Sequence, residues 1–218
     1  MLRKIDLSEI SDGKLYDAND MVKADCKGCE GCSACCRGMG KSIVLDPLDV
    51  HRLTTGLDMP FEALLTQYVE LNVVDGLILP NLKMSDTTDA CPFLNEQGRC
   101  SIHAYRPGIC RLFPLGRFYE NDGFRYFLQV HECPKPSKAK IKVYKWLDTD
   151  DIRTYEQFIR DWHYFLKALQ ERVAEMDDPT QARAICMYIL EQFYLAPCED
   201  FYEAFAARLD AAKKHFSV

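Results

Sequence analysis

Cysteine is the residue type in this chain whose number and spacing could do chemistry. Eleven cysteines occur in 218 residues, and five of them lie within the eleven positions from Cys26 to Cys36. Two residues separate Cys26 from Cys29, Cys29 from Cys32 and Cys32 from Cys35. Such a spacing lets the backbone turn so that two thiolates approach one metal while nearby N–H groups donate to sulfur. The segment therefore predicts a metal site.

The same segment contains the C-x2-C-x2-C-x3-C run of bacterial ferredoxins, which ends here at Cys36. Arg37 stands where those ferredoxins carry a proline, and the sequence has no second copy of the run. A ferredoxin is therefore not expected. The side chains of the adjacent residues Cys35 and Cys36 tend to diverge, so they do not readily chelate one tetrahedral centre. The pair indicates either two metal sites, or one ligand and one structural thiol.

Four more cysteines lie downstream, and with four of the first group they make eight candidate metal ligands, enough for two four-sulfur sites. These eight are Cys29, Cys32, Cys35, Cys36, Cys91, Cys100, Cys110 and Cys133. An iron–sulfur cluster such as [4Fe–4S], zinc, or both would suit this set. The downstream gaps of eight, nine and 22 residues differ from the paired C-x2-C knuckles of zinc ribbons, which favours iron–sulfur.

Basic residues flank the candidate ligands. Four thiolates give a zinc ion or an oxidised cluster a net negative charge, which neighbouring cations would offset. Arg37, Arg99, Arg106 and Arg111 lie within one to four residues of a candidate ligand, and we expect Arg106 and Arg111 to contact the cofactor. Each arginine could instead be solvated or pair with a surface acid. His103 and His131 lie near Cys100 and Cys133 and are alternative ligands, although most histidines are structural.

The cysteine pattern resembles a known family, the YkgJ-type cysteine-cluster proteins, described as zinc- or iron-chelating domains. The resemblance begins with the C-x-x-C-x-x-C-C element from Cys29 to Cys36. It continues through Cys91-Pro-Phe-Leu, then the segment Cys100-Ser-Ile-His-Ala-Tyr-Arg-Pro-Gly-Ile-Cys-Arg-Leu-Phe-Pro, and ends at Cys133-Pro134. It covers roughly residues 26 to 136, and several motifs in the same order make it specific.

This resemblance implies metal chelation by the eight cysteines, with zinc or iron left open, and leaves Cys26 additional to the family's set. A flagellin lysine N-methylase belongs to the same broad group, which raises iron–sulfur-dependent methyl transfer to lysine as a hypothesis. The first hypothesis is an iron–sulfur protein with a redox, sensing or substrate-modifying role, and the second is a zinc-stabilised structural or interaction module. The sequence does not decide whether the chain is an enzyme, nor which protein or small molecule is its partner.

Composition narrows the setting of this chemistry. The net charge of −6 and the absence of a basic stripe argue against a nucleic-acid partner. The first residues have no apolar signal region, and no apolar run approaches the roughly 18 residues of a membrane span. We therefore expect a cytoplasmic protein without a membrane partner, in which the reducing environment keeps thiols available for metal.

The elements that position the cysteines read as an α+β fold. We predict a cysteine-cluster metal-binding domain over residues 1–137, opening with an irregular lead-in over 1–25, and a helical region over 138–218 packed on it. Helices are expected from Pro47 and near Pro60, a short strand over 42–45, and hairpins at Asp75-Gly76 and at 121–123. Apolar residues spaced three and four apart predict helices over 152–173, from 179 to before Pro197, and over 201–216. Cys186 and Cys198 fall on or near apolar helix faces and are expected to be structural.

Overall fold

The computed structural model describes residues 6–26, 32–136 and 138–218, and its fold is α+β as predicted. The helices are α1 (Leu7–Ile10), α2 (Pro47–Leu57), α3 (Phe61–Gln67), α4 (Gly108–Leu112), α5 (Val143–Leu147), α6 (Ile152–Ala174), α7 (Pro179–Ile189) and α8 (Phe201–Phe216), with the 3-10 turns η1 (Ala34–Cys36) and η2 (His103–Tyr105) and the π-helix η3 (Leu190–Leu195). The strands are β1 (Met21–Asp25), β2 (Val69–Val74), β3 (Leu77–Leu82), β4 (Leu115–Glu120), β5 (Gly123–Leu128) and β6 (Ala139–Lys142).

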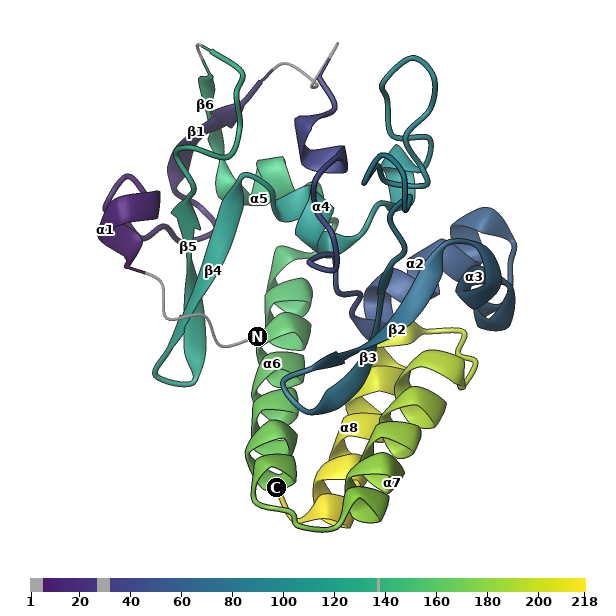
Figure 1. The fold of residues 1–218 in the computed structure, drawn as a ribbon. Helices are drawn as coiled ribbons and strands as arrows, with labels where there is room; N and C mark the ends of the chain where they lie inside the picture. The colour runs from purple at the N-terminus through teal and green to yellow at the C-terminus, as the bar shows by residue number, and fades with distance from the viewer. Residues whose placement is uncertain (1–5, 27–31, 137) are drawn as a thin grey trace.

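Helices α6, α7 and α8 lie side by side and form the lower half of the molecule in Figure 1. Asp151 caps α6 by accepting hydrogen bonds from the backbone N–H groups of Arg153 and Thr154. The apolar stripe predicted for this helix is buried, and Phe158 packs edge-on against Phe201 and Phe205 of α8. The three C-terminal helices that the periodicity predicts are confirmed.

Three antiparallel two-stranded sheets make up the strand content, in the pairs β1–β6, β2–β3 and β4–β5. Asp75 and Gly76 both have positive φ, 48° and 87°, which is the geometry of a tight hairpin turn between β2 and β3. Asn121 and Asp122 make the equivalent turn between β4 and β5. Both hairpins predicted from the turn residues are confirmed.

Two local predictions are wrong. Residues 6–26 of the lead-in are not irregular, because they contain α1 and the strand β1, which pairs with β6 far along the chain. Residues 42–45 form no regular strand, only an isolated bridge between Val44 and Asn81. Strand β1 was missed because its partner β6 lies far along the chain, and local patterns do not record such a pairing.

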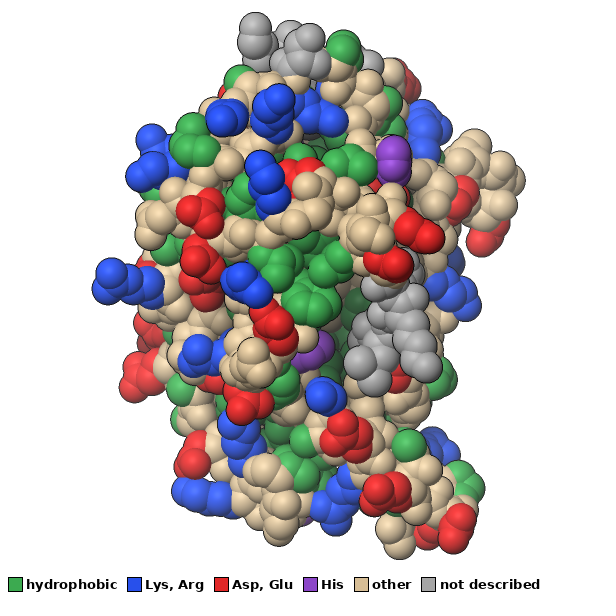
Figure 2. Space-filling model, turned by 90° about the vertical axis from the view of Figure 1, so that its left-hand side faces the viewer, with side chains coloured by type: hydrophobic (Ala, Val, Ile, Leu, Met, Phe, Trp, Pro, Cys, Tyr) green, Lys and Arg blue, Asp and Glu red, His purple; other side chains and the backbone are tan. Residues whose placement is uncertain are grey.

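The larger hydrophobic core joins both halves of the sequence. Buried residues of α2, α3 and the β2–β3 hairpin pack in one cluster with those of α6, α7 and α8, while β1, β5, α4 and α5 share a smaller core. The boundary between residues 137 and 138 stays a prediction. Within the described ranges no helix is both long enough and apolar enough to cross a membrane. Acidic and basic side chains alternate over the face shown in Figure 2.

Candidate metal centre

Five of the eight candidate cysteines line one cavity. Cys35, Cys36, Cys91, Cys100 and Cys110 surround a space of about 50 Å³. The rest of the lining is mainly apolar and consists of Ile43, Leu82, Met84, Phe93, Ile102, Pro107 and the side chain of Arg106. Thiols from three separate stretches of sequence therefore meet in mainly apolar surroundings, which contain few other polar groups that could bind to them.

The turn η1 carries Cys35 and Cys36 to the cavity, and backbone hydrogen bonds fix it to the next cysteine-bearing loop. The N–H of Cys91 donates to the carbonyl of Cys36 at 2.8 Å, and the N–H of Gly38 donates to the carbonyl of Asp89 at 2.9 Å. Arg37 and Ala90 form an isolated antiparallel bridge between the same two segments. The first and second cysteine groups are thus held in register by main-chain contacts.

Cys91 and Cys100 stand at the two ends of one tight loop. The N–H of Leu94 donates to the carbonyl of Cys91, and Leu94 forms an antiparallel bridge with Cys100. The N–H of Ser101 donates to the carbonyl of Phe93 at 2.8 Å. The backbone N–H two residues after each cysteine, from Phe93 and Ile102, donates to the cysteine sulfur and stabilises its thiolate. Backbone N–H donors to sulfur are also a feature of metal–thiolate sites.

Helix α4 presents Cys110, and a buried carboxylate holds the start of this helix. The Oδ1 atom of Asp49 accepts a hydrogen bond of 2.6 Å from the N–H of Gly108. Position 108 requires glycine, since a Cβ there would lie 2.8 Å from the Oη of Tyr155. Burial raises the pKa of Asp49 well above its usual range, and the neighbouring carboxyl of Asp46 raises it further. Asp46 caps α2 by accepting a hydrogen bond from the N–H of Asp49, and the sequence gave no signal for the role of Asp49 at the start of α4.

The cavity thiols influence one another's ionisation. Burial raises the pKa of Cys91, Cys100 and Cys110, and the other cavity thiols add to the effect. For Cys35 the main cause of its raised pKa is a hydrogen bond with Cys36, followed by burial. These thiols therefore hold their protons near neutral pH until a cation displaces them, which couples metal binding to proton release.

Arg106 supplies the positive charge that the cavity requires. Its side chain lines the cavity, and its Nε is buried with no hydrogen-bond partner among the described residues. Its charge lowers the pKa of Cys35 and Cys100 against the larger raising effects. An orphaned buried donor beside several thiols fits an anionic metal–thiolate centre, which would accept its hydrogen bond.

Arg111, the second predicted cofactor contact, does not line the cavity. It is 6% exposed and donates to the carbonyls of Ala104, Arg106 at 3.2 Å and Asp148 at 2.8 Å. These bonds fix the loop that carries Arg106. Arg111 therefore acts on the cavity through Arg106, and its predicted direct contact with a cofactor stays untested.

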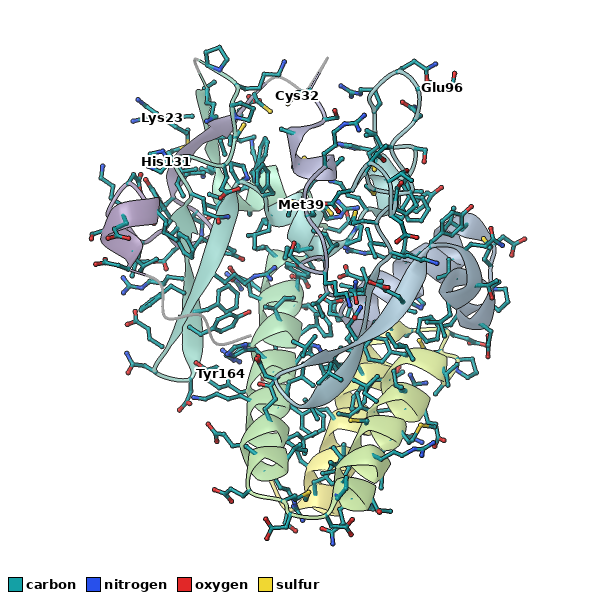
Figure 3. All side chains as sticks on the ribbon, in the orientation of Figure 1. Lys23, Cys32, Met39, Glu96, His131 and Tyr164 are labelled. Atoms are coloured by element: carbon teal, nitrogen blue, oxygen red, sulfur yellow. The ribbon has the colours of Figure 1, made fainter. Side chains whose placement is uncertain are left out.

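Two of the remaining candidate ligands, Cys32 and Cys133, do not line this cavity. In Figure 3 Cys32 lies near the upper end of the molecule, between Lys23 and Glu96. Cys133 follows β5, and its carbonyl accepts a hydrogen bond from Nζ of Lys138 at 2.9 Å. Cys29 lies outside the described residues. Arg37, Arg99, His103 and His131 are not among the residues that line the cavity.

The cavity brings thiols together without placing them in coordination geometry. Within residues 6–26, 32–136 and 138–218, no group of three or more His, Cys, Asp or Glu side chains is arranged to hold a metal ion. The eight predicted ligands accordingly stay predictions as individual residues.

Comparisons with known proteins place the chain in a family. No curated protein and no solved structure matches it. A family model of the CxxCxxCC type, described as "Putative zinc- or iron-chelating domain", matches residues 28–145. The match spans all the cavity cysteines and agrees with the resemblance to cysteine-cluster proteins seen in the sequence, whereas the relation to the flagellin methylase has no support from it. Because the matched residues make up more than half of the chain, the protein belongs to this family of zinc- or iron-chelating domains.

Proposed function

We propose that the cysteine cavity binds an iron–sulfur cluster, of the [4Fe–4S] type, through Cys35, Cys91, Cys100 and Cys110. The observation that carries this proposal is the convergence of these thiols on one apolar cavity that also contains an unpartnered arginine donor. Each of the other three thiols raises the pKa of Cys110, so the four thiols lie around a common space. Four thiolates complete the coordination of such a cluster.

Cys36 then belongs to a second group. Because four thiolates complete one cluster, Cys36, the fifth thiol of the cavity, is available to a separate site together with Cys29, Cys32 and Cys133 from the predicted set. The short segment from Cys32 to Cys36 carries ligands of both proposed sites, so it connects them directly. We propose that this second site also holds metal, either zinc or iron.

The surroundings of the cavity favour a cluster over a single zinc ion. Reduction potentials of clusters are set by net charge, hydrogen bonds to sulfur and exclusion of solvent. The chain supplies all three through Arg106, the N–H groups of Phe93 and Ile102, and the apolar lining. A bound cluster would contribute one-electron redox chemistry, and the protein residues would tune its potential. We propose a redox or sensing role in the cytoplasm.

Anaerobic purification followed by iron, zinc and acid-labile sulfide analysis tests the proposal. We expect a brown protein with stoichiometric iron and sulfide and a broad visible charge-transfer absorption. Cys110→Ser should lose the cavity cluster, whereas Cys133→Ser should lose only the metal of the second site. Cys186→Ser is the matched control, because Cys186 is a buried cysteine on α7 outside the cavity, and it should retain all the metal.

The outcomes separate the hypotheses. A colourless protein with zinc and no sulfide would refute the cluster and support the zinc-stabilised module. That second candidate rests on residues 83–107, which contain no regular element except the short turn η2 and would gain order from a metal. A protein that binds neither metal would contradict both. The lysine methylase hypothesis gains nothing from the geometry, because the polar pocket containing Asp17 and Glu156 shares no described lining residue with the cysteine cavity.

A further inference from the structure

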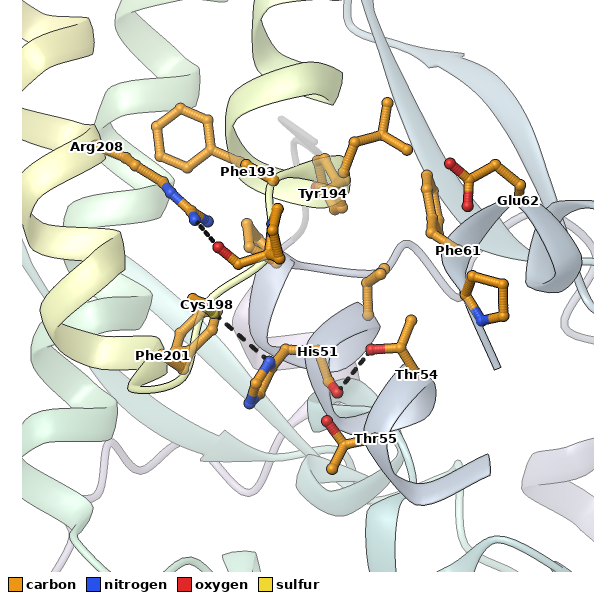
Figure 4. Close-up of a pocket in the computed structure, with 16 residues that line it drawn as sticks. His51, Thr54, Thr55, Phe61, Glu62, Phe193, Tyr194, Cys198, Phe201 and Arg208 are labelled. Atoms are coloured by element: carbon orange, nitrogen blue, oxygen red, sulfur yellow. Dashed lines mark hydrogen bonds between the residues drawn. The ribbon is translucent and has the colours of Figure 1, made fainter. Parts of the chain in front are cut away.

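A second cavity lies between α2, α3 and the chain that leads into α8. Its volume is about 300 Å³, and most of its lining is apolar, including Val50, Phe61, Phe193 and Phe201. Figure 4 shows one cysteine and one histidine pointing toward each other in this cavity. None of its lining residues is shared with the cysteine cavity described above.

The two residues are Cys198 and His51. The Sγ atom of Cys198 lies 3.7 Å from Nδ1 of His51, within hydrogen-bonding range for sulfur. The imidazole ring packs on Phe201, with 5.4 Å between the ring centroids. Because the residues are 147 positions apart, only the fold brings them together. A thiol beside a histidine base is the arrangement that activates cysteine as a nucleophile.

The backbone around Cys198 is built to hold this position. Helix α7 widens into the π-helix η3, a rare form that frequently marks functional sites. Tyr194 of η3 is buried, and its Oη donates to the carbonyl of Leu45 at 3.0 Å. Arg208 of α8 donates to the carbonyl of Pro197 at 2.7 Å. These two bonds anchor the chain that leads directly into Cys198.

The chemistry of the lining limits which electrophile could react there. Acyl transfer would need hydrogen-bond donors for a developing oxyanion. Thiol–disulfide exchange needs only an accessible path to sulfur and a proton for the leaving thiolate, which a mostly apolar cavity with one histidine provides. Arg208 and Glu62 lie on opposite sides of the cavity in Figure 4 and supply charges of both signs for a zwitterion.

We propose that Cys198 and His51 form a thiol–disulfide exchange site for low-molecular-weight disulfides of cysteine-containing peptides. The Cys198 thiol gives its proton to Nδ1 of His51 as its sulfur attacks one sulfur of the disulfide. A new S–S bond forms, the old S–S bond breaks, and the departing thiolate takes the proton from His51. Cys198 is oxidised to a mixed disulfide with one half of the small disulfide, and the other half is reduced and leaves as a thiol.

The protonation state of the base agrees with this sequence of events. Burial, with the charge of Arg52, lowers the pKa of His51, so its ring is neutral near pH 7 and able to accept a proton. Since the imidazole starts neutral, the proton moves during the attack and no preformed ion pair is required.

Oxidised glutathione is the probe that tests the site. The metal-loaded protein is purified anaerobically and incubated with it at pH 7. Acid quenching and peptide mass spectrometry then locate the adduct. We expect a mixed disulfide on Cys198 and none on Cys186, which is 3% exposed and serves as an internal control. Cys198→Ala should abolish this adduct and leave the metal content unchanged.

His51→Gln should slow the reaction at Cys198 about tenfold, because without a base only a few per cent of a thiol is ionised at pH 7. His215→Gln is the matched control, since His215 is exposed and stacks on Tyr188 outside the cavity, and its rate should equal that of the wild type. Added imidazole should restore the rate of His51→Ala, which a merely structural histidine would not allow. An unchanged rate in His51→Gln, or no adduct on Cys198 in the wild type, would overturn the proposal.

Discussion

The helical layer of α6, α7 and α8 and the cysteine-bearing loops above it are stabilised in different ways. In the helical layer, buried aromatic and aliphatic side chains pack continuously, and Trp162 alone contacts Phe165, Phe193, Tyr194 and Phe205. In the loops, order depends on a few main-chain hydrogen bonds and on polar anchors such as Asp49 and Arg111. We therefore expect the helical layer to keep its structure when a bound metal is lost, and the cysteine-bearing loops to lose order.

This difference separates structural support from chemistry. Loops can bring thiols from distant parts of the chain to one point, which a regular helix with its fixed side-chain spacing cannot do. The cost is weaker local stability, which a rigid layer beneath and a metal above can offset. The larger core includes Phe93 and Ile102 of the loops, so the two regions are joined by packing.

The strongest test of this comparison is metal removal. Binding of a structural metal is worth about 10 kcal/mol in small thiolate sites, so its loss should affect the loops most. We expect amide hydrogen exchange to become fast over residues 83–107 after treatment with a chelator, while amides of α6 keep their protection. Restoring iron and sulfide should reverse the change. Equal loss of protection in α6 would show that the two regions do not differ in this way.

A core substitution should produce the opposite pattern. Phe158→Ala removes a ring that is 2% exposed and packs on three rings of α8, so it should lower the free energy of unfolding by about 3–5 kcal/mol. Metal content of the folded protein should not change. Denaturant titration measures the loss. Met187→Ala is the control, because Met187 is 45% exposed and should change stability by less than about 0.5 kcal/mol. A loss of metal in folded Phe158→Ala would contradict the comparison.

Arg111 should affect stability and the metal together. Arg111→Met leaves the carbonyls of Ala104, Arg106 and Asp148 without their donor, at a cost of about 2–3 kcal/mol. The loop that carries Arg106 would loosen, so we expect weaker metal retention under competition with a chelator.

Arg111→Lys keeps the charge but not the planar array of donors, and it should recover only a small part of both losses. Full recovery by lysine would show that charge alone matters at this position. The exposed partner Asp148, 3.6 Å from Nη1, should contribute little, so Asp148→Asn serves as the control.

Local sequence patterns predicted the parts of the fold that depend on local physics. The three- and four-residue spacing of apolar side chains indicated α6, because a helix buries one face. Asp75-Gly76 indicated a hairpin, since few residues accept positive φ. The pairing of β1 with β6 was missed because no local signal specifies a partner so distant in the chain.

The candidate site was predictable in its chemistry but not in its grouping. Spacing predicted that the cysteines bind a metal, and the order of motifs indicated the family of zinc- or iron-chelating domains to which the chain belongs. Which thiols share a cavity depends on how residues 83–107 fold over η1, and no periodicity describes that loop. The meeting of His51 with Cys198 could not be predicted for the same reason, and the π-helix that leads into it leaves no distinct pattern.

His163 joins helix α6 to the β4–β5 hairpin, and its protonation gives the smallest of the predicted effects on stability. It lies on α6 and stacks on Tyr119 of β4, with 3.5 Å between ring centroids. Burial lowers the pKa of His163 to about 4, below its ordinary value of about 6.5. Between these values the unfolded chain binds a proton and the folded chain does not, so stability falls as pH drops from about 6.5 toward 4. The ring is half-buried, and solvent screening reduces the loss to about 1 kcal/mol.

His163→Gln isolates this contribution, because other groups titrate equally in both proteins. Urea unfolding at pH 7 and pH 4.5 should show a fall in stability that is about 1 kcal/mol smaller in the variant than in the wild type. His215→Gln, at an exposed position, should behave as the wild type. If stability falls by the same amount in the wild type and in His163→Gln, the ring of His163 stays hydrated at the contact between α6 and the β4–β5 hairpin.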